Sequence, residues 1–335
     1  MKSWKLTGPG VLEQTDVPVP APVEGKVKVR VTKVLLNGPD AAIFRGEIHT
    51  RYPIVPGRYA VGVVADEGHP FYHKGARVLL HTFLKRKDEG TEKRDFSEDD
   101  FLICGQTRDG FMRDFVFVSP DEMSLLPDSV SDERALMVQH VGLAKAAIDC
   151  LEGQKGRHIA VVGANIFGIL ICQLLIYQQA APILIDSNPA ALAFARECGI
   201  YYTLPTGDNM LDGVAHITGG RLASGAMYVT SAPGNDRNIP FQVCARESNT
   251  VICGPHTESI EFDLGLALRK QLSLHCVWNC DGYIENAINL IANRAVDINA
   301  FKTVAVKESD VVQLLRTFEE HPERDVDQLN IVTLL

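Results

Sequence analysis

A glycine-bounded turn, Gly163-Ala-Asn-Ile-Phe-Gly168, carries the clearest chemical signal in the sequence. It lies between a short apolar run at residues 159–162 and a longer apolar segment at 169–177, which predicts a strand, a turn and a buried helix. Such a turn at a helix N-terminus can bind the pyrophosphate of a dinucleotide. Asp186 follows the first glycine by 23 positions, near the spacing at which a carboxylate meets the adenosine ribose. We expect dinucleotide binding here, and the alternative is a structural turn without a ligand.

The turn departs from the usual G-x-G-x-x-G fingerprint at Asn165, where a glycine normally lets the backbone approach the pyrophosphate. Asparagine tolerates a positive φ better than most residues, so we expect the turn to survive. The Asn165 side chain would have to point away from the pyrophosphate. The sequence therefore predicts weakened dinucleotide binding.

Asp186 also indicates which dinucleotide binds. Its carboxylate would accept hydrogen bonds from both ribose hydroxyls of NAD and would repel the extra phosphate of NADP. Residues 187–189 include no arginine to receive that phosphate. NAD is therefore favoured over NADP.

Alternating strand and helix patterns surround this turn. Further strands are predicted at residues 182–185, 201–204, 226–230, 249–253 and 271–277, with helices at 188–198, 208–217 and 283–293. This alternation predicts a doubly wound parallel sheet, which binds ligands at the carboxyl ends of its strands. The expected cofactor-binding residues are Gly163, Asn165, Ile166, Phe167, Gly168, Asp186, Ser187, Ser231, Ala232 and Pro255.

The first part of the chain predicts a different structure. Short strands at residues 26–35, 59–65, 76–80 and 113–118, separated by Gly and Pro turns, predict a small β-barrel. Gly62 lies inside one of these strands and suggests a bulge or a close backbone approach. The highly charged residues 85–100 predict a solvated surface loop.

Composition narrows the class of protein. The net charge of −9 and the pI near 5.6 argue against a nucleic-acid partner. No apolar run is long enough to span a membrane, and the N-terminus lacks the apolar core of a signal peptide. The eight cysteines include no C-x-x-C pair, and the closest two, Cys276 and Cys280, are expected to be buried free thiols. We expect a cytoplasmic protein.

Four short segments together resemble the medium-chain dehydrogenase/reductase family, in particular its zinc-dependent alcohol and polyol dehydrogenase branch. They are Asn37-Gly-Pro-Asp40 with Phe44-Arg-Gly46, residues 53–64, residues 74–78 and residues 109–116. The resemblance covers nearly the whole chain. It implies an α/β protein with a GroES-like β-barrel domain at residues 1–145, to which 300–335 return, and a Rossmann domain at 146–299.

The positions that hold metal in this family are altered in the sequence. The resemblance places Asn37 at a cysteine ligand, Arg58 and Tyr59 at a histidine and a glutamate, and Gln139 at a later acidic position. Arginine cannot ligate a cation, and amides are poor zinc ligands. We expect neither a catalytic nor a structural zinc ion.

Asp40 remains from the family pattern, where the resemblance gives the corresponding acid a role in orienting a ligand histidine. We hypothesise that Arg58 occupies the emptied site and pairs with Asp40. The guanidinium could then polarise a carbonyl, with the Tyr59 hydroxyl as proton donor. The alternative is a structural pair that fills a dead site. The candidate catalytic residues are Asn37, Asp40, Arg58, Tyr59 and Gln139.

Two classes of function follow from these expectations. The first is a zinc-independent, NAD-linked oxidoreductase acting on a small alcohol or carbonyl substrate. The second is an inactive family member that keeps the fold, with or without the nucleotide, for binding or regulation. A third reading, an isomerase or epimerase that oxidises its substrate transiently with NAD, stays open. The resemblance also implies a homodimer formed through residues 272–278.

Overall fold

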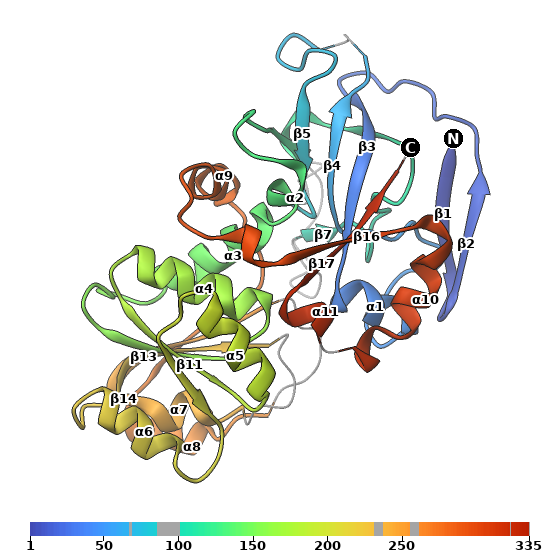
Figure 1. The fold of residues 1–335 in the computed structure, drawn as a ribbon. Coiled ribbons are helices and arrows are strands. Elements are labelled where there is room, and N and C mark those ends of the chain that lie inside the picture. The colour runs from blue at the N-terminus through green and yellow to red at the C-terminus, as the bar shows by residue number, and fades with distance from the viewer. Residues whose placement is uncertain (67–68, 86–100, 231–236, 255–260, 322, 335) are drawn as a thin grey trace, which may run out of the picture. The chain divides into compact units, whose positions relative to one another are not determined.

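The computed structural model describes residues 1–66, 69–85, 101–230, 237–254, 261–321 and 323–334 (Figure 1). The chain forms two compact units, one of Met1–Gln139, Thr303–Arg324 and Leu329–Leu335, the other of His140–Lys302 and Asp325–Gln328. Three expected cofactor residues, Ser231, Ala232 and Pro255, lie outside the described residues, as does the charged segment 86–100.

The first unit is built on antiparallel strands. In the described part of the chain, a seven-stranded sheet has the order β16-β17-β3-β4-β5-β9, and β8 also pairs with β3. The bounds are Val27–Leu36 for β3, Tyr59–Val64 for β4, Arg77–Leu80 for β5, Phe115–Val118 for β8, Met123–Leu125 for β9, Lys302–Val306 for β16 and Gln328–Thr333 for β17. The last strands of the chain therefore return to β3, as Figure 1 shows in red beside blue.

Alternate residues of β3 form the barrel core. Val27, Val29 and Val31 are buried, as the alternating sequence pattern predicted. A Cβ atom on Gly62 would lie 2.6 Å from the Arg30 carbonyl oxygen, and the β3–β4 register shifts between Val31 and Lys33. The predicted close approach at Gly62 is therefore present.

Several elements of the first unit carry no strong sequence signal. They are the hairpins β1 (Lys2–Gly8) with β2 (Val11–Asp16) and β6 (Phe83–Lys85) with β7 (Phe101–Ile103), and helices α1 (Gly38–Arg45), α10 (Val311–Arg316) and α11 (Glu323–Val326). Helix α1 bears on the candidate site, because the candidate residue Asn37 is its N-cap.

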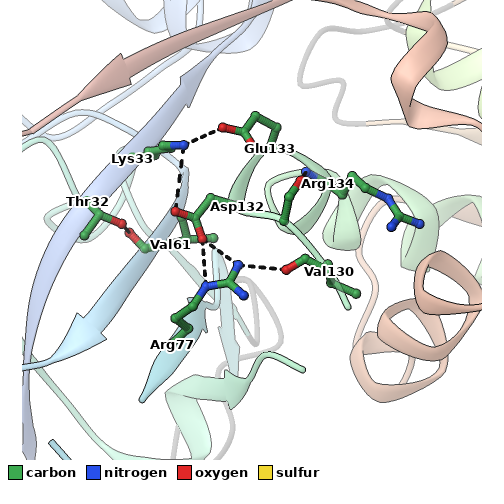
Figure 2. A network of polar contacts seen from close by, with 9 residues as sticks. Thr32, Lys33, Val61, Arg77, Val130, Asp132, Glu133 and Arg134 are labelled. Carbon is green, nitrogen blue, oxygen red and sulfur yellow. Dashed lines mark hydrogen bonds and ion pairs between the residues drawn. The ribbon is translucent and has the colours of Figure 1, made fainter. Parts of the chain in front are cut away.

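A polar network ties helix α2 (Asp132–Ala135) to two barrel strands (Figure 2). Arg77 on β5 donates from Nε and Nη2 to Oδ1 of Asp132, at 3.0 and 2.6 Å, and from Nη2 to the Val130 carbonyl at 2.7 Å. Lys33 on β3 forms ion pairs with Glu133 and, at 3.8 Å, with Asp132. The network fixes the start of the segment that leads to Gln139.

The second unit contains a parallel sheet. Its described strands have the order β12-β11-β10-β13-β14-β15. The bounds are His158–Val162 for β10, Ala181–Asp186 for β11, Tyr202–Pro205 for β12, Ala223–Val229 for β13, Cys244–Cys253 for β14 and Ser273–Val277 for β15. The direction of winding reverses between β10 and β13, which is the Rossmann arrangement expected from the sequence.

Helices connect these strands. They are α3 (Val138–Asp149), α4 (Ile166–Tyr177), α5 (Pro189–Glu197), α6 (Met210–Ile217), α7 (Ile239–Val243), α8 (Leu264–Lys270) and α9 (Ile284–Ala292). No helix among the described residues is long and apolar enough to cross a membrane. All eight cysteines are free, and Cys280 is buried, but Cys276 is exposed on the edge strand β15, contrary to expectation.

Candidate active site

The glycine-bounded turn lies where β10 ends and α4 begins. Gly163 has a φ of 117°, a conformation that favours glycine. A Cβ atom on Gly168 would lie 1.8 Å from the Gly163 carbonyl oxygen, so only glycine lets the helix approach the turn this closely. Both glycines of the fingerprint are therefore required by the geometry, as the sequence indicated.

Asn165 serves the turn in a way that the sequence did not suggest. Its φ of −85° and ψ of 179° are ordinary extended values, so no tolerance of positive φ is needed. Its side-chain Oδ1 accepts a hydrogen bond from the Gly168 N–H at 3.0 Å and caps helix α4. In the described part of the chain, the N–H groups of Ile166 and Phe167 donate no hydrogen bond and remain for an anion.

Asp186 binds the backbone of the same turn. Its Oδ2 accepts from the Ala164 N–H and its Oδ1 from the Asn188 N–H, both at 2.7 Å. The carboxylate is 6% exposed and joins the end of β11 to the loop after β10. Ser187 follows directly in the chain.

In the first unit, Asn37 and Asp40 form a reciprocal capping box at the start of α1. The Asn37 N–H donates to Asp40 Oδ2 at 3.1 Å, and the Asp40 N–H donates to Asn37 Oδ1 at 3.4 Å. The two candidate residues therefore lie together. Their side chains are committed to the backbone of the helix.

Asp40 is a buried carboxyl, 4% exposed. Burial raises its pKa to about 6, against the opposing effects of the Arg58 charge and of the backbone N–H groups of Asn37 and Arg58. Asp40 therefore exchanges a proton close to neutral pH.

Arg58 is buried beside this carboxyl, with an exposure of 2%. Its guanidinium carbon lies 5.6 Å from the centre of the Tyr59 ring and 5.9 Å from that of Phe83. The predicted pairing with Asp40 is not a contact, because the two side chains form no ion pair or hydrogen bond and act on each other only through space. Arg58 Nε is buried without any hydrogen-bond partner.

Tyr59 begins β4, pairs with Leu35 of β3 and is 3% exposed. Its ring lies against the Arg58 guanidinium. The role of the Tyr59 hydroxyl as a proton donor stays a prediction.

Gln139 is fully engaged by the backbone at the end of β5. Its Oε1 accepts from the Thr82 N–H at 2.8 Å, and its Nε2 donates to the Leu80 carbonyl at 3.1 Å. The Thr82 hydroxyl in turn donates to the Arg58 carbonyl. Gln139 was expected among the catalytic residues, and its amide contacts the backbone at the end of strand β5.

Three residues near Arg58 were not anticipated: Thr82, Phe83 and Gly105. Gly105 has a φ of +81°, and a Cβ atom there would lie 3.1 Å from Arg58 Cγ. The glycines in the segment 105–110 were the one available signal, since glycine marks positions where backbone and side chain come close.

The chain is similar in sequence to known dehydrogenases and reductases. Residues 23–128 match the alcohol dehydrogenase GroES-like domain. A zinc-type alcohol dehydrogenase-like protein of Haemophilus influenzae is 21% identical over 96% of both chains, and D-xylulose reductase of Saccharomyces cerevisiae is 23% identical over 96% of this chain and 95% of its own. The chain belongs to the medium-chain dehydrogenase/reductase family.

Solved structures share this dehydrogenase/reductase fold over the full length. An alcohol dehydrogenase from Escherichia coli CFT073, complexed with NADH, has a TM-score of 0.84 at 19% identity and covers 100% of this chain and 99% of its own. A zinc-binding dehydrogenase from Sinorhizobium meliloti 1021, bound to NADP, also has a TM-score of 0.84, at 17% identity over 99% of both chains.

The zinc of this dehydrogenase/reductase family does not fit the residues present. Arg58 is cationic, the Asn37 side chain caps α1, and the Gln139 amide binds strand β5. Within the described ranges, no group of three or more His, Cys, Asp or Glu side chains could hold a metal ion. Burial raises the pKa of the Cys104 thiol to about 12, which disfavours the thiolate that would bind a metal.

Proposed function

We propose that this protein is a zinc-independent oxidoreductase that transfers a hydride between NAD and a small alcohol or carbonyl compound. Family membership supports the reaction class, and relatives that include D-xylulose reductase and sorbitol dehydrogenase support a polyol or related substrate. The observation that carries the proposal is Arg58, a buried cation with an unpartnered Nε–H at a position where the family holds metal.

A buried N–H without an acceptor costs about 1–3 kcal/mol, which a ligand oxygen would offset. A guanidinium in a site without water stabilises negative charge that develops on a carbonyl oxygen. Arg58 therefore supplies the positive charge that a metal supplies elsewhere in the family. The Tyr59 hydroxyl, on the residue whose ring lies against the guanidinium, is the proposed proton donor.

NAD is the proposed cofactor, and it would supply the hydride when bound. The N–H groups of Ile166 and Phe167 would bind its pyrophosphate, and Asp186 would accept hydrogen bonds from its ribose. The absence of arginine at residues 187–189 favours NAD over NADP. Structural relatives bound to NADH or NADP support a nicotinamide cofactor without deciding between the two.

Metal analysis, calorimetric titration and steady-state rates test this proposal on the purified full chain. We expect no stoichiometric zinc, tighter binding of NAD than of NADP, and turnover of at least one of sorbitol, D-xylulose or 2,3-butanediol that a chelator does not inhibit. Stoichiometric zinc, or no binding of either dinucleotide, would overturn it. Arg58→Met should abolish turnover while NAD affinity stays unchanged, and unaltered turnover excludes the polarising role.

The second candidate function is a non-catalytic binding or regulatory role. The side chains of Asn37 and Gln139 favour it, because both are committed to backbone groups rather than directed at a ligand. NAD binding without turnover of any of these compounds would support this second function over the first.

A further inference from the structure

We propose that Thr82 and Gln139 are positioning residues that hold Arg58 in place for the reaction. The inference deepens the proposed function and rests on it, since it assumes that Arg58 acts on substrate. It is carried by a continuous series of contacts from Gln139 to Thr82 to Arg58, all within the first unit.

The series begins where the ladder between β4 and β5 stops. The antiparallel register pairs Ala60 with Leu80, and continuing it places Arg58 opposite Thr82. Neither residue belongs to a strand, so no ladder bond joins them. The Thr82 hydroxyl replaces that bond by donating to the Arg58 carbonyl.

Gln139 completes the strand end from the other side. Its amide accepts from the Thr82 N–H and donates to the Leu80 carbonyl, as a neighbouring strand would. The side chain is 2% exposed, so its loss would leave two buried backbone groups unpaired. Gln139 is itself placed by the segment that the Arg77–Asp132 contacts anchor (Figure 2).

Thr82 is thus bound at three of its atoms. Its N–H is bound by Gln139, its carbonyl accepts from the Cys104 N–H at 2.9 Å, and its hydroxyl binds Arg58. Thr82 has no exposed surface, and a Cβ atom at Gly105, next to Cys104, would lie 3.1 Å from Arg58 Cγ. A shift of Thr82 therefore moves the backbone of Arg58 with it.

The matched variants are Thr82→Val, which removes the hydroxyl at nearly constant shape, Thr82→Ser, which keeps it, and Gln139→Met. Thr32→Val is the control, because the Thr32 hydroxyl also donates to a barrel carbonyl, that of Val61 at 3.2 Å (Figure 2). We expect Thr82→Val and Gln139→Met to lower kcat by about 10- to 100-fold, as misplacement of a catalytic group does. KM for NAD should not change, Thr82→Ser should restore most of kcat, and Thr32→Val should leave it unaltered.

A second readout requires no turnover. Asp40 senses both the charge and the backbone N–H of Arg58, so displacement of Arg58 raises the pKa of Asp40 measured by carbon NMR on aspartate-labelled protein. We expect a rise of about 1 in Thr82→Val and in Gln139→Met, and none in Thr32→Val.

Unchanged titration of Asp40 in both variants would overturn the inference. So would kcat values of Thr82→Val and Gln139→Met equal to that of the unsubstituted protein, because a displaced Arg58 must slow the reaction. Unaltered turnover in Arg58→Met alone refutes the proposed function instead, and the Asp40 titration then still decides whether Thr82 and Gln139 hold Arg58.

Discussion

The Asn165 side chain accepts a hydrogen bond from the Gly168 N–H at 3.0 Å and so closes the first turn of helix α4 with a group of the protein itself. In the usual fingerprint this position is a glycine, and the helix terminus is left open for the pyrophosphate. Asparagine at this position therefore stabilises the free protein, but it occupies the Gly168 N–H, which a pyrophosphate could otherwise bind.

Replacing Asn165 separates these two effects. Asn165→Gly should bind NAD several-fold more tightly by calorimetry and lose only a few tenths of a kcal/mol of stability, because glycine is a tolerable N-cap. Asn165→Ala should lose about 1 kcal/mol in urea unfolding. Submicromolar NAD affinity in the unsubstituted protein would show that Asn165 does not weaken binding.

Asp186→Asn should disturb the turn and the cofactor preference together. An amide keeps one acceptor, so its NH₂ group would face the N–H of either Ala164 or Asn188. We expect a loss of about 1–3 kcal/mol in the free energy of unfolding and a smaller ratio of NAD to NADP affinity. Asn188→Ala, which removes only the cap of α5, is the control. An unchanged affinity ratio would contradict the ribose role of Asp186.

Asp40 makes stability depend on pH in a direction unusual for a carboxyl. Burial raises its folded-state pKa from 3.8 to about 6, so its contribution to stability is complete below pH 3.8 and is lost as the pH rises through 6. Asp40→Asn cannot ionise. Its free energy of unfolding, relative to the unsubstituted protein, should therefore be higher at about pH 7 than at about pH 4 by about 1–3 kcal/mol.

Urea unfolding at the two pH values measures this difference. Asp16→Asn, at an exposed carboxylate, is the control for the pH change alone. A relative stability of Asp40→Asn that does not change with pH would refute the assignment.

We also predict a homodimer formed through strand β15. This strand is the edge of the parallel sheet, and Leu274 on it is 39% exposed, with the exposed Leu264 and Leu268 on α8 nearby in the sequence. Leu274→Lys should give a monomer by light scattering after gel filtration, while Leu211→Lys, at an exposed leucine of α6, should not. A monomeric unsubstituted protein would refute the prediction.

The fold was predictable because its signals are local. Apolar periodicity and glycine spacing predict the strand, turn and helix from 159 to 177. Apolar alternation predicts strand β3, and the structure confirms both predictions. The hairpin of β6 and β7 and helix α1 are short, and their stability comes from packing that no local pattern reports.

The sequence predicted which residues lie at the candidate site better than it predicted what each of them does. The sequence indicated Asn37, Asp40, Arg58 and Tyr59 as candidates. It could not show that Asn37 and Asp40 cap a helix, or that Asp40 meets the backbone N–H of Arg58 and forms no ion pair with its guanidinium. The sequence did not predict Thr82 and Gly105 as neighbours of Arg58, because only the tertiary structure brings them close to it. Roles of this kind depend on ångström distances, which residue spacing does not determine.

The capping box at α1 determines what a substitution at position 37 would cost in stability. Returning a cysteine to position 37 would remove the helix cap, at about 1 kcal/mol, before any metal could bind to compensate. Arg58 would still repel a cation at that stage. This single substitution towards a metal site is therefore unfavourable by itself, because the capping box and the Arg58 charge both oppose it.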